Sequence, residues 1–334
     1  MLISFTKSTI MVIALTLSTT VMSQSLDESP SSQLDSFVDH MVTKHQFDGQ
    51  ILKALLSKTT LQENVLAAIQ KPYEALPWYR YRAIFLKPER AQAGAEFWKK
   101  HQAILSRAEK EYGVPASIIV AILGVETFYG QYTGKYPVLD SLVTLSFNYP
   151  PRATFFKKEL EELLLLAREE QLELSLLKGS YAGALGTPQF ISSSYRAYAV
   201  DFNQDGKRDL IHSVEDSIGS IANYFNRHGW KKGQPIALKT NPSNANIEAL
   251  LSPLNNPKPK YALSKLNQLG IPSPNIGYDY QAALIALETE QGSDYYLGLN
   301  NFYVITRYNH SAHYAMAVNE LSKDIMYRYQ LLND

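Results

Sequence analysis

The 334-residue sequence contains no cysteine. Disulfide bonds are therefore excluded, and so is a lipid anchor attached through a cysteine. An excess of charge of either sign is also lacking, because 32 lysines and arginines balance 32 aspartates and glutamates. Without a basic field to collect phosphates, we expect no nucleic-acid partner. The hydrophobic content of 45% nevertheless predicts a substantial core, spread over two or three domains.

The amino-terminal segment MLISFTKSTIMVIALTLSTTVMSQS places Lys7 before an apolar stretch, residues 10–17, which small residues follow. This order is typical of a secretory signal peptide, which we predict over residues 1–23 with cleavage after Ser23. The apolar stretch is shorter than the roughly 20 residues that a membrane-spanning helix needs, which disfavours a retained anchor. We therefore expect an exported protein that is soluble after removal of the signal.

Helical periodicity dominates the remaining chain. Over residues 34–110 it occurs in short pieces between prolines and predicts a helical domain. Residues 231–290 contain a stretch rich in Pro and Asn, which predicts a small β-containing domain. Residues 291–334 return to helix, with an apolar stripe after a possible Ser311 cap. The segment between these regions, 111–230, contains the residues with the clearest chemistry.

Glu126 ends an apolar run that is otherwise typical of a core helix. In GVPASIIVAILGVETFYG, Pro115 suits the first turn of a helix and Gly130 suits its exit, which places the acid in the last turn. Ile118, Ile122 and Glu126 share one face at four-residue steps. Partial desolvation and the negative end of the helix dipole both act to raise the pKa of such an acid. It could protonate a leaving oxygen in glycoside cleavage, or it could simply cap a helix or pair with an arginine.

A second informative segment is GSYAGALGTPQFISSSY, residues 179–195. Gly183, Gly186 and Pro188 argue against one regular helix, and small residues allow the backbone to approach a bulky ligand. Gln189 then offers an amide that can donate to and accept from sugar hydroxyls or an acetamido group. A plain turn between two helices is the other interpretation.

Three segments in this order and spacing resemble a known family. GVETFYG, SYAGALGTPQF and NFYVITRYNHSAHYAMAV look like the B-type lytic murein transglycosylases, glycoside hydrolase family 103, of the bacterial periplasm. The resemblance extends from about residue 35 to the end of the chain. It implies a mainly α fold in which residues 111–230 form a lysozyme-like catalytic core, with a surrounding helical domain and a small β-containing domain. Residues 291–334 would complete the cleft and the helical domain, and the location would be periplasmic.

The resemblance also implies a reaction. The β-1,4 bond between N-acetylmuramic acid and N-acetylglucosamine in peptidoglycan is cleaved without added water, leaving 1,6-anhydro-muramoyl ends. Glu126 is the implied single catalytic residue, acid first and base afterwards, and no organic cofactor is implied. The implied partners are peptidoglycan glycan strands, with proteins of cell wall synthesis or division as an open possibility. The expected substrate-binding residues are Ser180, Gln189, Phe190, Tyr224, Tyr308, Asn309, Tyr314, Tyr81 and Arg152. Relatives often carry two arginines where this chain has Pro151 and Arg152, which puts contacts to peptide-stem carboxylates in question because proline offers no donor.

Residues 201–216, DFNQDGKRDLIHSVED, begin with the D-x-N-x-D-G pattern of a calcium loop. Position twelve is His212 instead of the usual glutamate, so Glu215 or Asp216 must close a longer loop, and the family resemblance points to Asp216. The other interpretation is an Asx-rich turn held by its own hydrogen bonds. The expected ligands of a structural calcium ion are Asp201, Asn203, Asp205, the Lys207 carbonyl and Asp216.

Two other functions remain open on the sequence alone. A hydrolytic muramidase with the same fold would add water and release reducing ends. A calcium-stabilised glycan-binding protein would bind the same polymer with no turnover. Analysis of the reaction products distinguishes the first of these, and substitution of Glu126 tests the second.

Overall fold

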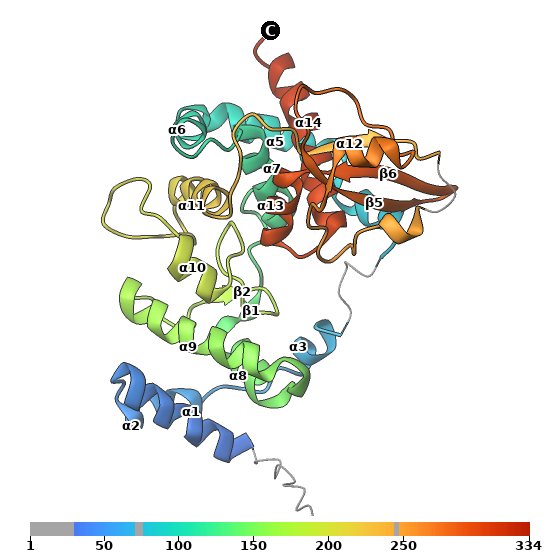
Figure 1. Cartoon of the computed structure of the whole chain (residues 1–334). Helices are drawn as coiled ribbons and strands as arrows, with labels where there is room; N and C mark the ends of the chain where they lie inside the picture. Colours follow the sequence, from blue (N-terminus) through green and yellow to red (C-terminus); the bar gives the residue numbers. More distant parts are fainter. Residues whose placement is uncertain (1–29, 71–75, 244–246) are drawn as a thin grey trace, which may run out of the picture.

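The computed structural model describes residues 30–70, 76–243 and 247–334 (Figure 1). The predicted signal peptide lies outside these residues. Among the helices described, none combines the length and the apolar character needed to span a bilayer. The described chain is mainly helical, with one four-stranded and one two-stranded antiparallel sheet, so the predicted fold class is confirmed.

Helix α7 (Ala116–Thr127) forms the centre of the fold. Its sequence ASIIVAILGVET is apolar on nearly all sides, as expected of a helix that is surrounded by others. Every residue of α7 is buried except Glu126. The helix packs against four others: α5 (Pro88–Lys100), α6 (Gln102–Tyr112), α11 (Val214–Arg227) and α14 (Ala312–Leu331). The core helix thus exposes a single side chain, and that side chain is the acid.

Helix α14 brings the end of the chain back to this centre. Ser311 caps it as predicted, because its Oγ accepts a hydrogen bond from the Tyr314 N–H at 3.3 Å. The predicted apolar stripe is buried, and the helix packs against α4 (Trp78–Phe85) as well as α5 and α7. Helix α13 (Asn300–Tyr308) precedes it and ends beside Glu126. The carboxyl-terminal segment therefore brings two tyrosines, Tyr308 and Tyr314, next to the acid.

The helical domain expected over residues 34–110 is divided in the structure. Its first part packs against α8, whereas α4 to α6 surround α7 and α14. The amino-terminal part joins the core through α8, where the Phe37 and Phe147 rings meet at 6.1 Å. Figure 1 shows α1 and α2 beside α8 and α9, away from α5 and α6. The elements of this region are α1 (Pro30–His45), α2 (Gly49–Leu56), α3 (Glu63–Ala68), α8 (Val138–Asn148), η2 (Pro150–Arg152) and α9 (Ala153–Glu170).

The small β-containing part is an antiparallel sheet with strand order β3-β6-β5-β4. Thr289 pairs with Gly292, so β5 and β6 form a tight hairpin. The domain boundary predicted at residue 290 is wrong, because it falls in the turn of this hairpin and the second strand hydrogen-bonds to the first. The elements are β3 (Ala237–Thr240), η3 (Glu248–Leu250), β4 (Tyr261–Ala262), α12 (Leu263–Gln268), β5 (Gln281–Thr289) and β6 (Gly292–Gly298). A core of its own stabilises it: Leu263, Leu266, Ile271, Ala282, Leu284, Leu297 and Leu299.

Candidate active site

Glu126 lies in the last turn of α7, as predicted, but the exit from the helix differs from the expectation. Gly130 was the expected exit residue, whereas three consecutive residues have positive φ: Phe128 at 50°, Tyr129 at 61° and Gly130 at 89°. Each non-glycine residue in this conformation costs on the order of 1 kcal/mol, so surrounding contacts must stabilise the turn. Glu126 lies two residues before this turn, so the same contacts also fix the direction of its side chain.

The Tyr129 side chain supplies such contacts. Its hydroxyl donates to the Arg90 carbonyl oxygen at 2.7 Å. A Cβ atom added to Gly94 or Gly124 would lie 2.4 or 2.6 Å from the same hydroxyl oxygen, so two glycines on α5 and α7 make room for the ring. Burial raises the pKa of Tyr129, which keeps the phenol a donor. The sequence analysis missed this residue; isolated glycines inside helical patterns were the available signal.

Tyr314 holds the acid directly. From the first turn of α14, its hydroxyl donates to Glu126 Oε1 at 2.6 Å. Burial, and after it the nearby charge of Glu126, raises the pKa of Tyr314 well above its usual range. The ring of Tyr308 stacks on that of Tyr314 with centroids 6.3 Å apart, and the Tyr308 hydroxyl donates to the Pro188 carbonyl oxygen at 2.6 Å. The predicted carboxyl-terminal and glycine-rich segments therefore meet at Glu126.

The glycine-rich segment is tied to the end of α7. The Thr127 hydroxyl donates to the Thr187 carbonyl oxygen at 2.8 Å and accepts from the Gly130 N–H at 3.0 Å. The Gln189 amide nitrogen donates to the carbonyl oxygens of Thr133 and Gly186, both at 2.9 Å. Gln189 was expected to donate to a ligand as well as accept from it. Its two N–H groups are already used, which leaves the Oε1 atom as the group it can offer to a ligand.

Ser180 shapes the start of this segment. Its Oγ accepts hydrogen bonds from the N–H groups of Ala182 and Ala184, at 3.3 and 3.0 Å. A serine hydroxyl that accepts from the N–H groups two and four residues later in the chain is typical of a serine that stabilises a turn. The structure thus places Ser180 in the scaffold of the loop, outside the residues that line the groove described below.

Gly186 provides a stability prediction. Its φ is 71°, and an added Cβ would lie 2.2 Å from the Leu210 carbonyl oxygen, a backbone atom that already accepts from the Thr187 N–H. Gly186→Ala is expected to destabilise the protein by about 3 kcal/mol, which urea unfolding measures. The matched control is Gly233→Ala, because Gly233 has φ 75° with nothing within 4 Å and should cost about 1 kcal/mol. Equal losses of unfolding free energy in the two variants would contradict the steric argument.

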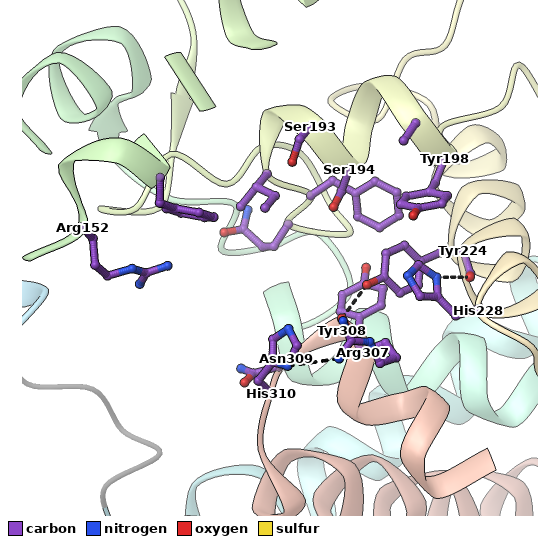
Figure 2. Close-up of a pocket in the computed structure, with 15 residues that line it drawn as sticks. Arg152, Ser193, Ser194, Tyr198, Tyr224, His228, Arg307, Tyr308, Asn309 and His310 are labelled. Carbon is purple, nitrogen blue, oxygen red and sulfur yellow. Dashed lines mark hydrogen bonds between the residues drawn. The ribbon is translucent and has the colours of Figure 1, made fainter. Parts of the chain in front are cut away.

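A groove of about 750 Å³ opens beside these residues. Figure 2 shows Ser193 and Ser194 on one wall and Tyr308, Asn309 and His310 on the other. Six of the predicted substrate-binding residues line it: Arg152, Gln189, Phe190, Tyr224, Tyr308 and Asn309. The sequence analysis missed further polar lining residues: Ser193, Ser194, Tyr198, His228, Arg307 and His310. Ser193, Ser194, Arg307 and His310 lie within the segments quoted above, but no local pattern indicated that they would line a groove, because their proximity arises only when α10 (Ser192–Tyr198) faces the end of α13.

Aromatic rings form the floor of the groove. Phe190 lies 5.6 Å from both Tyr224 and Tyr308, and the latter two rings are 5.0 Å apart, all in tilted or edge-on arrangements. The Tyr224 hydroxyl donates to the Arg307 carbonyl oxygen. Burial raises the pKa of Tyr224 and of Tyr308, so both phenols stay neutral. Such a surface suits the apolar face of a sugar ring.

Tyr81 and Tyr314 are placed behind the groove instead of on its surface. Tyr81 is 1% exposed and contacts the Phe85 and His313 rings, at 5.0 and 5.7 Å. Its influence on the pKa of Tyr314 shows that the two phenols are neighbours. Tyr81 therefore supports the residue that holds Glu126, and a direct contact between Tyr81 and substrate stays a prediction.

A buried carboxyl group lies behind one wall of the groove. Glu159, on α9, is 4% exposed, and its two oxygens accept from the N–H and the hydroxyl of Ser193 at 3.0 and 2.7 Å. Burial raises the pKa of Glu159, while these hydrogen bonds lower it. Both of its oxygens bind the first turn of α10, so this carboxyl group supports the groove wall and does not face the cavity.

The predicted calcium loop forms the turn that its pattern implies. Asp201 accepts from the N–H groups of Asp205 and Gly206 at 3.0 and 2.8 Å, and the Asn203 side-chain oxygen accepts from the Asp205 N–H at 3.0 Å. Gly206 has φ 91°, which explains glycine there. The hydrogen bonds also agree with the alternative of an Asx-rich turn, so they do not by themselves decide between the two interpretations.

Asp216 closes this loop from α11. It is fully buried, and its carboxylate accepts from the N–H groups of Phe202, Asn203 and Asp209 at 2.8, 3.1 and 2.9 Å. Burial raises the pKa of Asp216, its backbone hydrogen bonds lower it, and the charge of Asp201 raises it further. Glu215, the other candidate, is exposed. A buried carboxylate beside a second carboxylate, within a set of hard oxygen donors, fits a divalent calcium ion.

The fold and the site define a class of protein that sequence comparison identifies. The family described as Transglycosylase SLT domain matches residues 29–323, and the chain belongs to this family. The resemblance inferred from the motifs is therefore confirmed, together with the lysozyme-like fold.

Individual relatives of known name give a more specific comparison than the family does. The chain is 44% identical over 316 residues to membrane-bound lytic murein transglycosylase B of Escherichia coli (strain K12), covering 91% of this chain and 86% of the relative. It is 45% identical to the catenated lytic transglycosylase SltB1 of Pseudomonas aeruginosa, with a TM-score of 0.84 and coverage of 91% and 99%.

Two solved complexes of relatives carry ligands. The Escherichia coli lytic transglycosylase Slt35 in complex with calcium is 45% identical, with a TM-score of 0.81 and coverage of 91% and 95%. SltB3 of Pseudomonas aeruginosa in complex with NAG-anhNAM-pentapeptide is 30% identical, with a TM-score of 0.78 and coverage of 90% and 80%.

Proposed function

We propose that this chain is a lytic transglycosylase that cleaves peptidoglycan glycan strands between N-acetylmuramic acid and N-acetylglucosamine, with Glu126 as its catalytic residue. One observation carries the assignment of that residue. Glu126 is the only residue of α7 that is not buried, and Tyr314 holds its carboxyl group. It is not among the residues that line the groove, but it lies close enough to Tyr308, which does line it, to raise the pKa of that phenol. Family membership supports the reaction class, and the anhydro-sugar complex of SltB3 supports the product.

The reaction needs one group that gives a proton and later takes one. Glu126 first donates its proton to the oxygen of the bond that breaks, while the acetamido group of the substrate supports the positive anomeric carbon. The ionised Glu126 then removes the proton of the C6 hydroxyl, and that oxygen bonds to the anomeric carbon. The proton count balances without water. The Tyr314 hydroxyl stabilises the carboxylate between the two steps.

The groove residues suit this substrate. The free Oε1 of Gln189 can accept from an acetamido N–H, since its amide nitrogen is held by Thr133 and Gly186. The rings of Phe190, Tyr224 and Tyr308 form a floor for sugar rings. Arg152 and Arg307 line the same cavity and offer cationic donors to carboxylates of the peptide stems. Asn309 completes the wall beside the acid.

The experiment that tests the function is product analysis. Purified peptidoglycan digested with the protein is expected to release fragments with 1,6-anhydro-muramoyl ends, which mass spectrometry separates from reducing ends. Reducing ends would instead assign a hydrolytic muramidase, and an intact polymer would assign a binding protein. The proposed substrate supports a periplasmic location, to which the signal peptide predicted over residues 1–23 would deliver the protein. A role alongside proteins of cell wall synthesis or division is part of the same proposal.

The calcium ion is proposed as a structural ligand of the loop over residues 201–216. Asp201, Asn203, Asp205, the Lys207 carbonyl and Asp216 would hold it, and the calcium complex of Slt35 supports the assignment. The loop precedes α11, which carries Tyr224 into the groove. When bound, the ion supplies positive charge between carboxylates that otherwise repel one another, and it takes no part in proton transfer.

Calcium removal is therefore expected to affect stability more than turnover. If the ion is present at about a hundred times its dissociation constant, chelation removes about 2.7 kcal/mol and lowers the melting temperature by roughly 5–10 °C. Turnover measured well below the melting temperature should change little. The control is Asp205→Asn, whose melting temperature should no longer respond to chelator. An unchanged melting curve for the unsubstituted protein would count against a bound ion.

A further inference from the structure

Outside the set of residues that line the groove, two histidines of α1 converge on one carboxylate of α9. His40 Nε2 lies 3.1 Å from Glu161 Oε2, and His45 Nε2 lies 2.6 Å from Glu161 Oε1. The ligand atoms of all three side chains lie within 4.8 Å of one another, and among the residues that the structure describes they form the one such group of His, Cys, Asp and Glu. The side chains of His45 and Glu161 are 17% and 14% exposed, whereas that of His40 is 44% exposed, so the cluster is open to solvent on the side of His40.

The donor set matches the preference of zinc. Zinc takes imidazole nitrogen and carboxylate oxygen at about 2.0–2.2 Å, which places neighbouring donor atoms of a tetrahedron roughly 3.3–3.5 Å apart. The two nitrogen–oxygen distances in the cluster, 3.1 and 2.6 Å, are shorter than this range by less than an ångström. Small side-chain rotations therefore suffice to admit the ion. Each ring would then carry its proton on Nδ1, and water would take the fourth position.

The site is held in place by contacts outside the three donors. The Arg168 guanidinium, one and a half to two turns further along α9, donates to the His45 carbonyl oxygen at 2.8 Å. This bond fixes the end of α1 against the helix that carries Glu161.

The Lys44 ammonium group would compete with a metal cation for the Glu161 carboxylate. Its ammonium group lies 2.9 Å from Glu161 Oε1, on the same oxygen that His45 contacts. The Lys44 side chain is 56% exposed, so it can turn into solvent. Exposed ion pairs of this kind contribute only about 0–1 kcal/mol, which a metal–ligand bond exceeds.

We propose that His40, His45 and Glu161 form a zinc site that fastens the amino-terminal helix to α9. Zinc would replace the Lys44 ammonium as the cation on Glu161 and link two elements that are more than a hundred residues apart in the chain. The site is separate from the calcium loop in both position and chemistry, because imidazole favours zinc whereas hard oxygen donors favour calcium.

The test uses the full chain without an affinity tag, in excess calcium so that the other loop is saturated. Titration with Co²⁺ as a probe is expected to give the intense visible absorption of a four-coordinate ion, and Zn²⁺ should abolish that absorption by displacement. Zn²⁺ at about a hundred times its dissociation constant should raise the melting temperature by about 5 °C or more. No absorption and no change in melting temperature at micromolar metal would overturn the proposal.

Three variants make the result specific to this cluster. His45→Ala should weaken Co²⁺ binding at least tenfold. Lys44→Ala should tighten it, because a competitor is removed, whereas a mere ion-pair cluster predicts no change in metal affinity. His212→Ala is the matched control: His212 pairs with Asp209 at 3.0 Å on an 81% exposed side chain, and its loss should leave binding unchanged. Equal binding by the His45 and His212 variants would reject the site.

Discussion

Glu126→Gln is expected to reduce the release of anhydro-muramoyl products toward the upper end of the 10²–10⁴-fold range that general acid–base catalysis contributes. The upper end applies because the same carboxyl group serves two proton transfers, and an amide can perform neither. The shape of the side chain is nearly unchanged. Glu126 is partly exposed at the end of an otherwise buried helix, so its replacement should leave the melting temperature within a few degrees.

The matched control is Glu109 of α6, whose side chain contacts the opposite end of α7. Glu109 Oε2 accepts a hydrogen bond from the Ala116 N–H at 3.0 Å, at the first turn of α7. Glu109→Gln retains an oxygen acceptor for that bond and lies away from the groove, so turnover should stay within about twofold. Both variants are assayed by product release from purified peptidoglycan and by thermal unfolding. Digestion that persisted in Glu126→Gln would reject this residue as the catalyst.

Tyr314→Phe is expected to lower kcat by roughly 10- to 100-fold with a smaller change in KM. The variant removes the donor that lies 2.6 Å from Glu126 Oε1 while it keeps the buried ring. Hydrogen bonds to charged groups contribute about 1.5–3 kcal/mol, and every 1.4 kcal/mol corresponds to a tenfold change in rate. Tyr314 is buried, lies outside the residues that line the groove and contacts the acid, so we expect it to act as a positioning residue for Glu126.

The pH profile separates this role from a merely structural one. The Tyr314 hydroxyl donates to Glu126 and favours its ionised form, so without it the proton is held more tightly. The alkaline limb of kcat, which reports loss of the proton needed for the first step, should therefore move to higher pH. Tyr308→Phe is the comparison, because that hydroxyl donates to the Pro188 carbonyl oxygen. In Tyr308→Phe the alkaline limb of kcat should stay at the same pH. An alkaline limb that did not move in Tyr314→Phe would contradict the positioning role.

Local patterns were sufficient to predict much of this fold. The apolar run before Glu126 predicts a core helix with an acid in its last turn, and the structure has α7 there with that one residue not buried. Ser311 was identified as a cap from residue type and spacing alone, and it does cap α14. Such features depend on neighbours within a few residues, so they can be read along the chain.

Domain boundaries were less accessible to the same reasoning. The prediction of one helical domain over residues 34–110 joined elements that pack on different partners, and the boundary at 290 divided a hairpin. Periodicity tells which face of a helix is apolar but not which other face covers it. The Phe37–Phe147 contact joins residues too far apart in the chain for any local pattern to indicate.

The sequence by itself determined the chemistry: one acid at the end of a core helix, a glycine-rich segment with Gln189, oxygen donors at alternate positions of a loop, and motifs sufficient for the family. Only the tertiary structure decided which atoms meet. It placed the Tyr314 hydroxyl on Glu126, committed the Gln189 amide nitrogen to Thr133 and Gly186, and set Tyr81 behind the groove. Residue type and spacing specify what a side chain can do, whereas its partners follow from packing between segments distant in the chain, which no local pattern encodes.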